Sequence, residues 1–259
     1  MMTALLNKIE AFSTAWLYRT SKYRKPLAEL PPNLYSYWQR TAAFEFKGIP
    51  QDAFFFVRAT EGLFMFFECV SSTELPCGLP SKAADSVWHA WARLAPEHLE
   101  RFCRAHYGRA IAHTEAGEMT VPMDQALANA LVAARKRQGL PVAGLNVPKL
   151  FSLDRRLRMP RGFAYSLKKG QVAYRDMDAN GKGTGAVHLP ASLMPGALLG
   201  VGLVSRWDYE QYEAKAKASG GGGCGSGCGS SACDGGGGGD GGGGCGSSCG
   251  GGCGGGCGS

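Results

Sequence analysis

Four of the five histidines in the chain lie between His89 and His113, and Cys103 lies among them. Imidazole nitrogens, thiolates and carboxylates are the ligands that zinc and similar divalent metals accept in tetrahedral geometry. Asp85 precedes His89 by four residues, so on a helix the two side chains would lie on one face. The residues of this segment that could hold a metal ion are therefore Asp85, His89, Cys103, His106 and His113.

Two short helices would have to position these side chains. The apolar spacing predicts a helix over residues 82–93 and a second over residues 96–107, with Pro96 suited to its first turn and Gly108 to its end. A tight turn between them would bring the Asp/His face of the first helix toward the Cys/His face of the second. We expect His113 to reach the same space from the chain just beyond Gly108.

An ordinary structural role for the same residues stays open at this point. Asp85 could simply pair with His89, and Cys103 and His106 could be satisfied core residues. The segment has no paired C-x-x-C motif of the kind that marks many structural zinc sites. The sequence therefore allows both a metal site and a purely structural cluster.

A longer pattern surrounds the histidines. The run Asp85-Ser-Val-Trp88-His89-Ala-Trp91 is followed by Cys103 and then by His113-Thr-Glu115. This stretch, with the glycine-rich end of the chain, resembles glycine-rich domain-containing proteins, which show a D-x-x-W-H-x-H pattern, a Cys, a further His and a glycine-rich tail. The resemblance implies that the positions of interest are Asp85, Trp88, His89, Cys103 and His113.

One position departs from that pattern. Trp91 stands where the resembled proteins commonly have a second His, so any metal site that used that residue would lack a ligand here. The resemblance implies no particular activity.

The last forty residues form a region of different composition. From Gly220 to Ser259 there is no Leu, Ile, Val, Phe, Trp, Tyr or Met, so we expect a disordered tail with nothing to bury. Its seven cysteines could wrap a soft metal ion, be lipidated, form intermolecular disulfides or contact a protein partner; a plain low-complexity spacer is the alternative. They are Cys224, Cys228, Cys233, Cys245, Cys249, Cys253 and Cys257.

The rest of the chain predicts a mainly α fold with a small β-containing extension. We expect a helical domain over residues 1–140, a mixed strand and loop extension over residues 141–218, and the tail over residues 219–259. Helices are expected at residues 2–20, 33–44, 53–70, 122–139 and 210–217. In the extension we expect a hairpin over residues 171–189, turning at Asn180-Gly181, and turns with a buried strand over residues 183–205.

The distribution of charged residues along the chain indicates possible partners and argues against a membrane span. All 28 Lys and Arg precede Ser219, so the body is basic, which suits nucleic acid or simply solubility. The apolar run over residues 53–70 carries Arg58, Glu61 and Glu68, which favours a buried helix over a membrane span. Residues 1–20 lack the features of an export signal, because Lys8 and Glu10 interrupt their apolar stretch, so we expect a cytoplasmic protein.

Three functions follow from these signals. The first is a non-enzymatic binding protein that holds zinc or a similar ion through the histidine segment and uses the tail for metal or protein contacts. The second is an RNA-associated protein, because Arg161-Gly-Phe163-Ala-Tyr165 resembles the start of an RNA-recognition strand. The third is a metal-dependent enzyme, although no phosphate loop or nucleophile elbow suggests its reaction.

Overall fold

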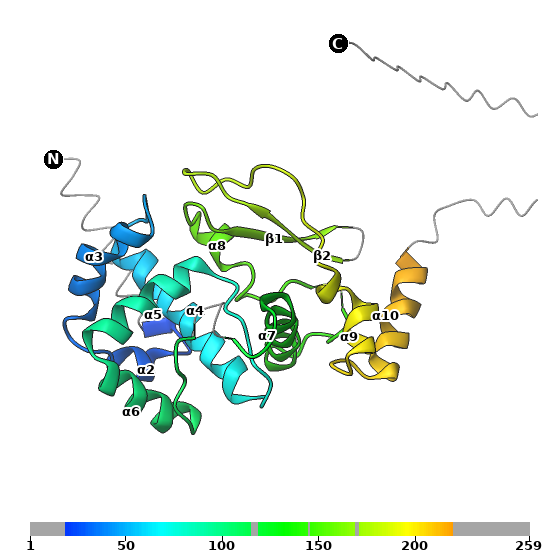
Figure 1. Ribbon diagram of the computed structural model, residues 1–259, viewed down its shortest axis with the longest axis horizontal. Coiled ribbons are helices and arrows are strands. Elements are labelled where there is room, and N and C mark those ends of the chain that lie inside the picture. Colours follow the sequence, from blue (N-terminus) through cyan, green and yellow to red (C-terminus); the bar gives the residue numbers. More distant parts are fainter. Residues whose placement is uncertain (1–18, 115–118, 145, 169–170, 220–259) are drawn as a thin grey trace, which may run out of the picture. The chain divides into compact units, whose positions relative to one another are not determined.

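The computed structural model describes residues 19–114, 119–144, 146–168 and 171–219 (Figure 1). The expected helix at residues 2–20 lies outside the described residues except for its last two residues. The expected tail lies outside them except for Ser219. The described part is mainly helical with one small antiparallel sheet of two strands, so the predicted fold class is confirmed for this part of the chain. Its first elements are α2 (Arg24–Ala28), α3 (Leu34–Glu45), α4 (Ala53–Ser71), α5 (Lys82–Leu94), α6 (Pro96–Tyr107) and α7 (Met123–Arg137).

Helix α4 contacts helices α5, α6, α7 and α8, and it begins where the sequence predicts. The side chain of Asp52 caps it by accepting a hydrogen bond from the backbone N–H of Phe55. Most of its side chains are buried, among them Phe64 and Phe67, which confirms a buried helix here. Gly62 allows a close helix contact, because a Cβ at this position would lie 2.1 Å from Cδ2 of Leu153.

Helix α5 carries Asp85 and His89, and a carboxylate from a distant segment holds its first turn. Asp154 lies in the short helix α8 (Leu153–Leu157) and is fully buried. Its oxygens accept hydrogen bonds from Ser81 Oγ at 2.6 Å, from the backbone N–H groups of Lys82 and Ala83 at 3.0 Å, and from that of Phe163 at 3.1 Å. A carboxylate here also complements the positive end of the helix dipole.

The sheet pairs β1 (Phe163–Lys168) with β2 (Gln171–Asp176) in antiparallel register. Beyond β2 the chain turns again, so that Tyr174 bridges His188 and Met177 bridges Gly183. The predicted turn at Asn180-Gly181 is confirmed, and Asp178 Oδ1 accepts hydrogen bonds from the backbone N–H groups of Asn180 and Lys182. The sequence prediction missed β1 as the main partner of β2.

The apolar run over residues 183–205 contains helical turns where we expected a buried strand, so that prediction is wrong. The structure has a 3-10 helix, η2 (Ala191–Leu193), and helix α9 (Pro195–Gly200), followed by α10 (Arg206–Ser219). Proline lacks the N–H that a strand ladder needs but fits the first turn of a helix, where Pro195 lies. None of the helices in the described part is both long and apolar enough to cross a membrane.

Candidate metal centre

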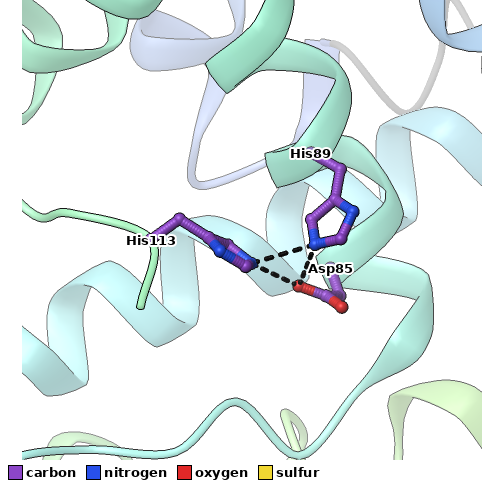
Figure 2. A group of neighbouring side chains, drawn as sticks. All are labelled: Asp85, His89 and His113. Carbon is purple, nitrogen blue, oxygen red and sulfur yellow. Dashed lines mark hydrogen bonds and ion pairs between the residues drawn. The ribbon is translucent and has the colours of Figure 1, made fainter. Parts of the chain in front are cut away.

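Three of the five predicted ligands converge in the structure (Figure 2). Asp85 and His89 project from successive turns of α5, and His113 reaches them from the chain after α6. His113 Nε2 lies 3.1 Å from Asp85 Oδ1 and 3.1 Å from His89 Nε2, and the third side, His89 Nε2 to Asp85 Oδ1, is 3.6 Å. Within the described ranges this is the only group of three or more His, Cys, Asp or Glu side chains close enough to share a metal ion.

The three distances match the spacing of ligands around a tetrahedral ion. Zinc bonds of about 2.0 Å place neighbouring ligand atoms about 3.3 Å apart. A circle through the three atoms has a radius of about 1.9 Å, so an ion just outside their plane would lie about 2 Å from each of them. The three ligand atoms are therefore already spaced for such an ion.

Neighbouring rings and backbone groups hold the two imidazoles in place. The ring of Trp88 meets that of His113 edge-on, with centroids 4.6 Å apart, and Phe46 contacts the ring of His89 at 5.8 Å. The guanidinium of Arg109 donates to the backbone oxygens of Val70 and Thr73, which ties the segment before His113 to the end of α4.

Glu45, at the end of α3, orients His89 from behind. Its Oε2 lies 2.5 Å from His89 Nδ1, and its other oxygen accepts from Arg93. A carboxylate can only accept, so Nδ1 carries the hydrogen and Nε2 of the neutral ring keeps its lone pair facing Asp85 and His113. Such a carboxylate behind a histidine is the usual arrangement at protein metal sites.

The Glu45 carboxylate is itself stabilised in its charged form. Burial by itself would raise its pKa, but the hydrogen bonds from Arg93 and His89 and the positive charge of Arg93 outweigh this and hold the pKa of Glu45 below its usual value. Sequence reasoning did not identify Glu45, because it lies on a separate helix and nothing in its local pattern relates it to His89.

Cys103 and His106 do not belong to this group, which corrects the expected arrangement. Cys103 is fully buried, and burial raises the pKa of its thiol to about 11, which disfavours the thiolate that a metal would need. His106 Nε2 lies 2.7 Å from Glu29 Oε2. Packing accounts for this, because Phe102 of α6 lies against Trp91 of α5, with ring centroids 4.8 Å apart, and the neighbouring Cys103 is buried in the core outside the Asp85 group.

The aromatic residues of the RNA-like motif are part of the fold. Tyr165 is 3% exposed and packs edge-on against Phe151 at 5.1 Å. The partly buried ring of Phe163 lies under Lys82 Nζ, 4.9 Å from the ring centroid. Tyr165 could not stack on a base without leaving the core, so Phe163 and Tyr165 do not form an open pair of rings.

Comparison with known proteins places the chain in a family. Neither the curated proteins nor the solved structures include a match to it. The family described as UCP032817-like matches residues 57–189, a range that contains Asp85, His89 and His113. Since this range is a little over half of the sequence, the chain belongs to the UCP032817-like family.

Proposed function

We propose that the protein binds a divalent transition-metal ion, zinc in the first instance, through Asp85, His89 and His113. The observation that carries the proposal is the triangle of 3.1, 3.1 and 3.6 Å formed by their ligand atoms. Two imidazoles and one carboxylate form a set that suits zinc and its neighbours better than magnesium or calcium, which prefer all-oxygen sites.

Hydrogen bonding by itself accounts for these contacts less completely. With Nδ1 of His89 protonated toward Glu45, the three converging atoms share at most one hydrogen while both rings are neutral, namely that on His113 Nε2. This hydrogen can serve only one of its two neighbours well. A metal ion would satisfy all three lone pairs at once.

The tail is a second, separate candidate for metal or partner binding. It lies outside the described residues, and the proposal that its seven thiols bind a soft ion or a protein partner rests on their number and spacing. The kinship with glycine-rich domain-containing proteins likewise stays a prediction, because the family match concerns residues 57–189 and does not reach the tail.

Metal analysis of the full chain tests the site at Asp85, His89 and His113 if the tail cysteines cannot bind metal. We would replace all seven tail cysteines by serine, load the protein with zinc, remove the excess and measure bound metal. We expect about one zinc ion per chain. His113→Ala and His89→Ala should remove it.

Two histidines outside the group provide matched controls. His106 pairs with Glu29, and His188 pairs with Asp176, both away from the candidate site. His106→Ala and His188→Ala should therefore leave the zinc content unchanged. Absence of zinc from the parent, or equal content in His113→Ala, would refute the proposal. The additional zinc bound when the tail cysteines are restored then measures the contribution of the tail to metal binding.

A further inference from the structure

The three ligand side chains line a cavity of about 790 Å³. Their side chains are 30, 23 and 24% exposed for Asp85, His89 and His113, so solvent reaches them from this cavity. The other walls are mostly apolar and include Leu75, Leu79, Ile111 and Met123. This volume suits a small organic molecule more than a single water.

The metal site would have room for a ligand from that cavity. Asp85, His89 and His113 provide three ligands, and no fourth comes from the rest of the described chain. Glu45, which contacts the far side of His89, has both oxygens engaged by His89 and Arg93. Structural zinc sites use four protein ligands, whereas sites with three keep a position open to water or a small molecule.

Charge favours an anion at that position. A divalent ion with two neutral imidazoles and one carboxylate keeps a net positive charge, and Glu45 and Arg93 neutralise each other. Arg109 adds a guanidinium to the same cavity wall, although Glu74 pairs with it.

We propose that the metal is open toward this cavity and that the cavity binds a monocarboxylate with an apolar body, the carboxylate on the ion and the apolar part against Leu75, Leu79 and Met123. This inference rests on the proposed metal binding. The acid head is selected by the ion's charge, and the apolar body by the side chains that surround it.

Cobalt spectroscopy separates the two proposals. The full chain with its tail cysteines replaced by serine would be loaded with Co²⁺, whose visible absorption reports its ligands, and titrated with acetate, butyrate, hexanoate and octanoate. We expect every acid to change the spectrum, with affinity rising by up to about fourfold for each added CH₂ that is buried.

Substitutions at the rim test the apolar part. Leu75 and Met123 are 46 and 37% exposed, so the neutral polar substitutions Leu75→Asn and Met123→Gln should fold normally. They add no charge, so they should keep the cobalt spectrum and the response to acetate but lose most of the gain in affinity with chain length. Val201→Asn, at an exposed apolar residue that does not line this cavity, is the control and should behave as the parent.

Each negative result has a distinct meaning. If no acid alters the cobalt spectrum, the chain itself completes the coordination and the open site is refuted, while metal binding stands. If acetate and octanoate bind equally well to the parent, the apolar cavity is refuted as the recognition element. If cobalt does not bind at all, the metal centre fails together with everything built on it.

Discussion

Two carboxylates, those of Asp154 and Asp85, lie at the start of helix α5, and their surroundings differ sharply. Asp154 meets its first turn, is fully buried and accepts four hydrogen bonds, one from a hydroxyl and three from backbone N–H groups. Asp85 lies in the first turn of the helix itself, with its side chain 30% exposed, and its Oδ1 faces two imidazole nitrogens. Both carboxylates lie at the first turn of α5, yet the one from α8 is saturated with donors and the one in α5 is not.

The difference separates a structural carboxylate from a binding one. Every lone pair of Asp154 that the fold can reach is matched by a donor, so there is no capacity left for a ligand. The atoms around Asp85 have more lone pairs than hydrogens, which is stable in water but better satisfied by a cation. The two sites thus differ in their balance of hydrogen-bond donors and acceptors.

The largest expected effect concerns stability. Asp154→Ala would leave a buried hydroxyl and three backbone N–H groups without an acceptor, and should lower the free energy of unfolding by at least about 3 kcal/mol. Asp85→Ala in metal-free protein should cost less than about 1 kcal/mol, because its surroundings are solvated. Urea denaturation of both variants measures this, and equal losses would contradict the distinction.

Zinc should make Asp85 important for stability. At a free zinc concentration about 100 times the dissociation constant, the parent with tail cysteines replaced should gain about 2.7 kcal/mol of unfolding free energy. Asp85→Ala should gain almost nothing. Denaturation curves with and without zinc give the result, and a full gain in Asp85→Ala would remove this carboxylate from the metal site.

A smaller effect on zinc affinity is expected for Glu45, which contacts His89 on the side away from the metal site. Glu45→Ala removes the acceptor that orients His89 and should weaken zinc binding by about 10- to 100-fold without abolishing it. Glu29→Ala, which removes the carboxylate beside His106, is the matched control and should leave the affinity unchanged. Competition with a chromophoric chelator measures both constants; similar values for the two variants would deny Glu45 an orienting role.

The smallest effect is expected for Cys103. Its thiol is buried outside the ligand group, so Cys103→Ala should change the zinc affinity by less than about twofold, since distant sites act independently. The same chelator competition checks this. A large loss of affinity would return Cys103 to the ligand set that its position in the sequence suggested.

Local signals determined the helices that carry the site. Ser81 caps α5 through a hydrogen bond from the backbone N–H of Ala84, Pro96 occupies the first turn of α6, and Gly108 ends α6 in the left-handed conformation. These are interactions within one or two turns, so they are legible from neighbouring residues. The four-residue spacing of Asp85 and His89 likewise placed both on one face.

Only the tertiary structure decided which side chains would join them. Phe102 of α6 packs against Trp91 of α5 with tilted rings, and in this packing Cys103 and His106 lie outside the group that His113 joins. The place of Glu45 depends on how α3 packs beside α5. Backbone hydrogen bonds and capping act over a few residues and can be read along the chain, whereas the relative rotation of helices depends on side-chain packing between distant segments, which no local pattern encodes.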